Sequence, residues 1–406
     1  MVTNTIYKFT KTKLNKKYTR TKPTKKVYPS TTTEKNQNKN INQIHKLKGA
    51  YEFLKFKGIN GKFKGVYNFD TKTQKLSYPD RLNKKHNNSI LINNKNEFPN
   101  DYLNIINNNS NFINNLKKTN KKYNFLEDII TLSAIDYEIE KKENKDCFFV
   151  LPSQLNGAEY PSYEKRYIVK KISQYKLDNT GGPRGQLAVH PACGQFILDN
   201  ASNDNNLNGL NAVKDILDII NDDKYDITLK NGYLKVPKNN NNSSSLKNNL
   251  DQIRILGMKN VKVDGYYYGR NNPDSGSTRN SESYNVNLIY ASAIPINTYT
   301  NEYINNNLKS IANSILIAQY YGSLCEAFKY NYKKKLKGKQ TFLMPLGGGV
   351  FNNDIKDITE CLLKSIILVK LKYPSFFKYV KPKILCFHKN KSESKNIKKH
   401  ISKLIN

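Results

Sequence analysis

The sequence predicts an α/β protein built around a central mixed sheet. From about residue 124 onward, apolar runs of strand length alternate with segments of helical spacing over roughly 270 residues. Glycine-rich segments interrupt this alternation at several points. Hydrophobic residues make up 37% of the 406 residues, enough for a core over part of the chain. We therefore expect a three-layer sandwich over residues 123–406, preceded by two segments of different character.

The first of these segments, residues 1–48, is strongly basic. The first 125 residues hold +21 of the net charge of +34, although a general richness in Asn, Lys, Ile and Tyr is also typical of AT-rich genomes. Few large apolar side chains occur here, so we expect a disordered arm. Two interpretations stay open, a solvated tail or loose contact with nucleic-acid phosphates. The residues assigned to phosphate contact are Lys11, Lys13, Lys16, Lys17, Arg20, Lys25 and Lys26.

The second segment, residues 49–122, is predicted to be a small β-rich piece followed by a linker. Alternating aromatic residues and the turn signal Asn60-Gly61 indicate a hairpin or meander over residues 49–80. Residues 81–122 are rich in Asn and Lys, with one short helix expected around residues 102–116. We expect this piece to dock on another part of the molecule, because a lone hairpin is marginally stable.

The five cysteines are widely spaced, and no pair has the spacing of a zinc site. We interpret them as small buried hydrophobic residues in a reducing compartment. The histidines show no metal-binding spacing, so no metal site and no cofactor is predicted. No apolar run reaches the length of a membrane span, and the N-terminus lacks the apolar region of a secretory signal. These observations favour an intracellular protein, cytoplasmic or nuclear.

The elements of the predicted sandwich follow one another in a regular order. Helices are expected over 125–139, 210–220, 246–256 and 304–330, with a basic helix closing the chain. Strands are expected over 147–152, 285–296, 341–346 and 382–388, with a hairpin about Asn231-Gly232. Residues 178–185 are expected to form a glycine-rich loop, and residues 239–245 and 266–283 to be polar loops.

A second glycine-rich loop stands between a predicted strand and a predicted helix. Three consecutive glycines end the apolar run 341–346, and helical spacing resumes after Asn353 or Asp354, a suitable N-cap. Such a loop lets backbone N–H groups and the helix N-terminus approach an anion. The other interpretation is a tight turn without a ligand. The candidate phosphate-binding residues are Gly347, Gly348, Gly349, Val350 and Phe351.

Three segments resemble the macro domain, the ADP-ribose-binding fold. Ile197–Asn203 resembles that family's strand ending in Asn-Ala-Ala-Asn, Val286–Pro295 its central strand, and Met344–Asn352 its second phosphate loop. The likeness covers about residues 145–390 and is closest to an uncharacterised macro-like group. The resemblance implies that Asn200 and Asn203 contact a ribose and that Asn203 positions a water in hydrolases. Where the family has a glycine-rich loop, this chain has only Gly209, which puts hydrolysis in doubt more than binding.

Acid and base candidates lie in the loops between these segments. Asp178, Glu159 and His190 are the titratable side chains there, although Asp178 could equally serve an Asx turn and His190 could be a core residue. Gln154 and Asn156 either bind a base edge or tie loops together. A further anion site is expected from Gly181, Gly182 and Arg184, whose guanidinium offers a bidentate fork.

Two functions follow. The first is a nucleotide-binding module for ADP-ribose or a related compound, with ADP-ribosyl hydrolysis through Asn203 and Asp178 as an added activity. The second is a structural or nucleic-acid-binding protein that uses the basic arm and has no enzymatic role.

Overall fold

The computed structural model describes residues 68–70, 75–77, 91–92, 98–162, 168–189, 191–202, 210–221, 227–237, 243–263, 284–296, 305–387 and 391–406. The predicted basic arm, the Asn60-Gly61 turn and the polar loop at 266–283 lie outside these ranges. The chain divides into two units, residues 1–44 and residues 45–406. All the elements below belong to the second unit.

One mixed sheet runs through the unit. Among the described residues it has seven strands in the order β3-β8-β9-β5-β10-β11-β4. The five strands from β9 to β4 are parallel to one another, and β8 and β3 are antiparallel to their neighbours. The strands are β3 (Leu91–Ile92), β4 (Ile130–Leu132), β5 (Phe148–Pro152), β8 (Ile255–Val263), β9 (Tyr284–Ala291), β10 (Lys339–Leu343) and β11 (Val380–Cys386).

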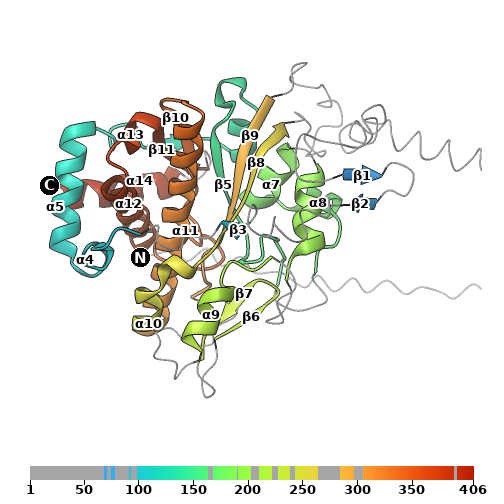
Figure 1. The fold of residues 1–406 in the computed structure, drawn as a ribbon, viewed down its shortest axis with the longest axis horizontal. Helices are drawn as coiled ribbons and strands as arrows, with labels where there is room; N and C mark the ends of the chain where they lie inside the picture. The colour runs from blue at the N-terminus through green and yellow to red at the C-terminus, as the bar shows by residue number, and fades with distance from the viewer. Residues whose placement is uncertain are drawn as a thin grey trace, which may run out of the picture. The chain divides into compact units, whose positions relative to one another are not determined.

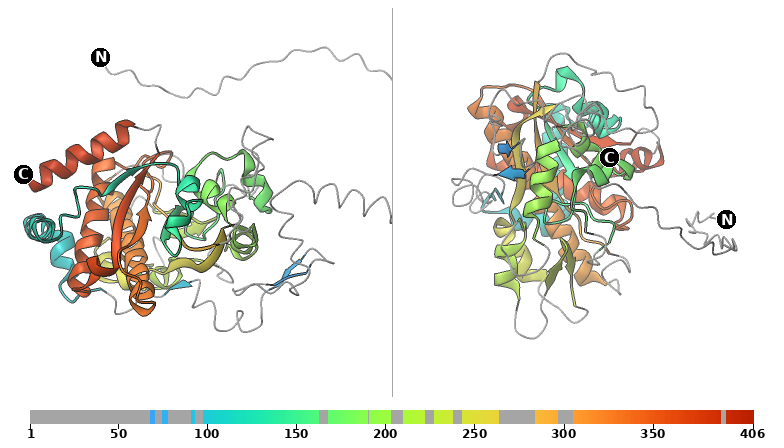
Figure 2. Two further views of the ribbon diagram at one scale, coloured as in Figure 1. Left: turned by 90° about the horizontal axis from the view of Figure 1, so that it is seen from above. Right: turned by 90° about the vertical axis from the view of Figure 1, so that its right-hand side faces the viewer.

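Helices cover both faces of this sheet (Figures 1 and 2). The long helix α11 and helix α12 pack together on one side, and α7 and α8 lie on the other side. The helices are α4 (Tyr102–Asn107), α5 (Asn109–Tyr123), α6 (Ile135–Ile139), α7 (Gly181–Ala188), α8 (Pro191–Asn200), α9 (Lys214–Ile220), α10 (Ser243–Asn248), α11 (Asn306–Lys333), α12 (Ile355–Lys372), α13 (Phe376–Tyr379) and α14 (Lys391–Ile405). Short 3-10 turns are η2 (Lys142–Asn144), η4 (Ile172–Leu177) and η5 (Leu250–Gln252).

The central mixed sheet and the α/β class predicted from the sequence are confirmed. So are strands β5, β9, β10 and β11 and helices α9, α11, α12 and α14 at their predicted places. The predicted hairpin is also present, as β6 (Thr228–Lys230) and β7 (Tyr233–Lys235). Its two turn residues both have positive φ, +49° at Asn231 and +79° at Gly232, as a type I′ turn requires.

Four predictions were wrong. Residues 246–256 do not form one helix, because α10 ends at Asn248, η5 follows it and β8 begins at Ile255. Residues 125–139 form strand β4 and the short helix α6 instead of one helix, because Ile130–Leu132 pairs with β11. Residues 181–188 form helix α7 instead of a loop. Residues 197–200, which the family resemblance places in a strand, belong to helix α8. Pro191 begins that helix, and Cys193, Phe196 and Ile197 bury one of its faces. Strand β8 and its place beside β9 were not predicted.

The region upstream of residue 123 also contributes to the core. A hairpin is present there as β1 (Asn68–Asp70) paired with β2 (Lys75–Ser77). The predicted helix near 102–116 is present as the pair α4 and α5. Ile105, Phe112 and Leu116 on these helices join the same hydrophobic core as the sheet, so the compact unit begins before the predicted boundary at residue 123.

All five cysteines are buried and unpaired by disulfides, as predicted. Within the described ranges, no helix has both the length and the apolar character needed to cross a bilayer.

Candidate functional site

A pocket lies where the parallel strands end. It is lined by residues that follow β4, β5, β9, β10 and β11, which are consecutive neighbours in the sheet. In open α/β sheets, ligands bind outside the carboxyl ends of the strands. The pocket has a volume of about 320 Å³, near the lower end of the roughly 300–1,000 Å³ typical of small-molecule sites. Its position and size fit a binding site.

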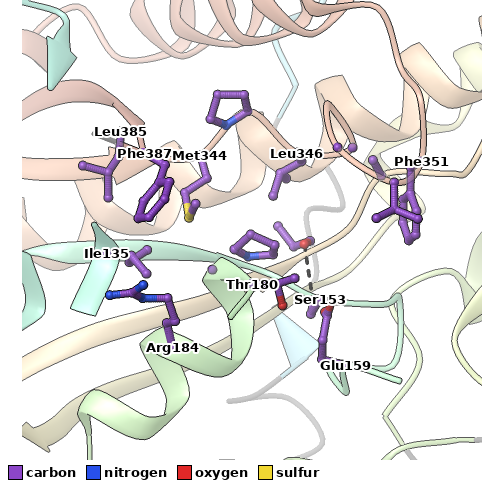
Figure 3. A pocket seen from close by; sticks show the side chains of 18 of the residues that line it. Ile135, Ser153, Glu159, Thr180, Arg184, Met344, Leu346, Phe351, Leu385 and Phe387 are labelled. Atoms are coloured by element: carbon purple, nitrogen blue, oxygen red, sulfur yellow. Dashed lines mark hydrogen bonds between the residues drawn. The ribbon is translucent and has the colours of Figure 1, made fainter. Parts of the chain in front are cut away.

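Two walls face each other across this pocket (Figure 3). One wall carries apolar side chains from the C-terminal half of the chain, Met344, Leu346, Leu385 and Phe387. The opposite wall carries four polar side chains, which come from the loop after β5 and from the start of α7. They are Ser153, Glu159, Thr180 and Arg184. An apolar body with a few convergent polar groups is the usual make-up of a ligand pocket.

The predicted glycine loop forms one rim of the pocket. Gly347 has φ +80°, and a Cβ there would lie 2.5 Å from Asn353 Nδ2 and 2.6 Å from Ala293 Cβ. The positive φ and the close packing against Asn353 and Ala293 therefore both require glycine at position 347. By contrast, a Cβ on Gly349 would meet no atom within 4 Å. Gly349 faces open space at the rim, and Val350 beside it is 66% exposed.

The loop is fixed from beneath by two side chains. Tyr320 on α11 donates its hydroxyl to the Met344 carbonyl at 2.7 Å and accepts the Leu346 N–H at 2.9 Å. The Asn353 amide donates to the Ile294 carbonyl at 3.0 Å, which ties the loop to the end of β9. The loop is therefore anchored before any ligand binds. Among the described residues, the N–H groups of Gly347 and Gly349 have no hydrogen-bond partner.

Helix α7 begins at the polar wall. Gly181 and Gly182 are its first residues, and its N-cap Thr180 makes no capping hydrogen bond. Gly182 packs so closely on β5 that a Cβ would collide with the Pro152 carbonyl oxygen. Glycine thus brings the helix N-terminus, with its uncapped N–H groups and partial positive charge, to the strand ends.

Asp178 and Arg184 are held by protein partners. The Asp178 carboxylate accepts the backbone N–H of Thr180 at 2.8 Å and its hydroxyl at 2.7 Å, the Asx turn considered from the sequence. Arg184 donates from Nε and Nη2 to the two carboxylate oxygens of Asp136, at 2.8 and 2.6 Å. The Arg184 guanidinium, expected to bind an anion of a ligand, therefore binds the Asp136 carboxylate. The Arg184 side chain still lines the pocket.

Two carboxyl groups line the pocket, those of Glu159 and Glu393. Burial, together with the nearby charge of Asp178, raises the pKa of Glu159 well above its ordinary value. Burial likewise raises the pKa of Glu393, which arrives from the first turn of α14. A protonated carboxyl donates a hydrogen bond and does not repel an anion. Both groups are therefore compatible with a phosphate when they are neutral.

The remaining residues predicted to form the site either do not line this pocket or lie outside the residues that the structure describes. The Asn200 side chain donates to the Phe196 carbonyl within α8 at 2.9 Å. Asn203, Gly209 and His190 are outside the described residues. Gln154 and Asn156 are buried and tie loops together, through Tyr160 and Tyr233 in one case and Ser202 in the other. The lysines and arginine of the arm are likewise outside the description.

Sequence reasoning did not single out several polar lining residues, among them Ser153, Thr180 and Glu393. Ser153 directly follows β5, so its position at a strand end was a usable signal. No local signal marks Glu393, which lies more than 200 residues after Glu159 in the chain. Within the described ranges, no group of three His, Cys, Asp or Glu side chains gathers with the geometry of a metal site.

No family model and no curated protein matches this chain.

Proposed function

We propose that the chain binds a nucleotide carrying a diphosphate, of the ADP-ribose class, in the pocket at the carboxyl ends of β5, β9, β10 and β11. The observation that carries the proposal is that two backbone segments meet at one pocket and that each has two N–H groups without a partner among the described residues, those of Gly347 and Gly349 and those of Gly181 and Gly182. These segments are the loop Gly347–Phe351 and the first turn of α7. Together they offer donors to an anion from two sides.

The other groups in the pocket fit the rest of such a ligand. The Phe351 ring packs at 5.9 Å from the Tyr233 ring and lines the pocket, where it can contact a ribose. Ser153 and neutral Glu159 supply polar contacts for ribose hydroxyls. The apolar wall of Met344 and Leu385 excludes water, which strengthens hydrogen bonds to the phosphates.

The proposal keeps one part of the macro-domain resemblance, the glycine loop after β10, and drops another, the alignment of residues 197–203. The segment expected to carry the family's ribose-contacting strand is helix α8, so that alignment is wrong. The parallel strands and the glycine loop after β10 still support a diphosphate ligand on physical grounds alone. Hydrolysis through Asn203 and Asp178 stays a prediction.

Ligand-induced stabilisation tests the proposal. Addition of ADP-ribose should raise the melting temperature of the full chain in a saturable way, by an amount equivalent to about 2.7 kcal/mol at a hundredfold excess over Kd. ADP and inorganic pyrophosphate should give smaller shifts, because each offers fewer contacts.

Gly349→Glu and Gly349→Gln form the matched pair of variants. Both side chains begin in open space, so both proteins should fold. Only the glutamate places a negative charge at the rim, so only Gly349→Glu should lose the shift. The proposal is ruled out if the wild-type protein is folded and none of the three compounds raises its melting temperature. It is also ruled out if ADP-ribose raises the melting temperature of the two variants by the same amount.

A further inference from the structure

A second surface, at the opposite ends of the same strands, is rich in lysine. It is built from the C-terminal ends of α5, α11 and α12, from α13, and from the start of β11. We call it the lysine–tyrosine surface. Its lysines are Lys121, Lys122, Lys333, Lys334, Lys335, Lys337, Lys370, Lys372, Lys378 and Lys381.

Direct contacts show that these segments lie side by side. Tyr123 at the end of α5 stacks on Phe377 of α13, with ring centroids 4.6 Å apart. The Gly338 N–H, just after the lysines that end α11, donates to the Lys378 carbonyl at 3.0 Å. In Figure 1, α13 lies beside the upper end of α5. The lysines therefore form one continuous surface.

The positive charge of this surface is not balanced by nearby acids in the sequence. No Asp or Glu occurs in residues 102–126, 327–353 or 361–392, the stretches that contain all ten lysines. Residues 126–328, by contrast, contain 21 Lys and Arg against 23 Asp and Glu. Within the described ranges, Lys333, Lys334 and Lys335 are exposed and form no ion pair.

Aromatic rings lie among these lysines. Tyr332 is 58% exposed, and its ring packs edge-on against Tyr379, with centroids 5.2 Å apart. Lys122 and Lys370 both lie over the Tyr123 ring, at 5.4 and 5.6 Å from its centroid. Tyrosine faces beside ammonium groups can stack bases while the lysines contact phosphates.

We propose that the lysine–tyrosine surface binds single-stranded nucleic acid. A single strand exposes both bases and phosphates, which matches the interleaving of rings and charges. Duplex DNA hides its bases in the stack and would use only the lysines. The surface lies at the amino ends of β10 and β11, so it is separate from the pocket at their carboxyl ends.

Fluorescence anisotropy with labelled 12-nucleotide oligo(U) and oligo(dT), on the full chain, tests this proposal. The triple variant Lys333→Glu/Lys334→Glu/Lys335→Glu should bind at least tenfold more weakly. The slope of log K against log salt should fall by about 2, since each phosphate contact on a single strand contributes roughly 0.7. The matched control is Lys230→Glu/Lys235→Glu, which changes exposed lysines of the β6–β7 hairpin and should bind like wild type.

Two further measurements locate the bound strand. Tyr332→Ala should lose about tenfold in affinity with an unchanged salt slope, because it removes stacking and no charge. Ultraviolet cross-links should map to peptides containing Tyr332 or Tyr379. Unchanged affinity and slope in the triple variant would overturn the proposal. Cross-links confined to residues 1–48, or binding to anionic vesicles without binding to either oligonucleotide, would also overturn it.

Discussion

The Asp136–Arg184 pair allows a quantitative prediction. The Asp136 side chain is 0% exposed and that of Arg184 is 13% exposed, and two hydrogen bonds of 2.8 and 2.6 Å join them. Removing one partner of a buried, doubly hydrogen-bonded pair leaves an uncompensated charge and costs about 3–5 kcal/mol. We therefore expect Arg184→Ala to lower the free energy of unfolding by about that amount.

A second bidentate pair in the same protein provides the control. Arg254 and Asp215 are joined by two 2.6 Å hydrogen bonds, but their side chains are 22% and 23% exposed. Water screens this pair better, so Arg254→Ala should cost clearly less than Arg184→Ala. Urea denaturation followed by circular dichroism measures both losses. The double variant Arg184→Met/Asp136→Leu should regain most of the stability, since it leaves no unpaired charge.

The reasoning is refuted if Arg184→Ala loses less than about 1 kcal/mol, the range of surface ion pairs. It is also refuted if the two single variants lose equally, because burial would then not decide the cost. The result also bears on the pocket. The Asp136 carboxylate neutralises the Arg184 guanidinium, so the attraction of Arg184 for a phosphate is weakened.

Two further predictions concern the pocket. Gly347→Ala should cost at least about 1–3 kcal/mol in a thermal melt, from its left-handed backbone alone, whereas Gly349→Ala should melt like wild type. The raised pKa of Glu159 means that its stabilising contribution is complete below the ordinary glutamate pKa and is lost as pH rises through the folded-state pKa. Affinity for ADP-ribose should fall over the same pH range as the carboxylate forms. In Glu159→Gln both pH dependences should be weaker, and an unchanged profile would contradict this assignment.

The sequence predicted those elements whose pattern was long or chemically specific. Helices α11 and α12 present apolar positions over many turns, and the Asp354 N-cap accepts the Lys356 N–H at 2.8 Å as expected. The Asn231-Gly232 hairpin needs two positive φ values, which few other dipeptides tolerate. Such signals are local, so they survive without knowledge of the tertiary structure.

The failures occurred where tertiary contacts override local preference. Helix α7 contains three glycines and a proline, a composition that disfavours a helix on propensity alone. It forms because Gly182 and Gly185 pack against β5 at Pro152 and Leu151, more closely than any larger residue could. In α8 the apolar run Phe196–Leu198 was too short to distinguish a helix from a strand by periodicity. The first of these errors fell on a segment that lines the pocket.

The candidate site could be predicted only as separate halves for the same reason. The glycine loop after β10 and the first turn of α7 were each visible as glycine clusters, but their meeting depends on the parallel order β9-β5-β10-β11. That order also fixes what lies at the other ends of the strands. The lysines that end α11 and α12 stand immediately before β10 and before the α13–β11 segment, so they must gather at the amino edge of the sheet. One strand order thus places the pocket and the lysine–tyrosine surface at opposite ends of the same strands. A small anionic ligand should therefore bind the pocket with weak salt dependence, while a polyanion on the lysine–tyrosine surface should be strongly salt-dependent.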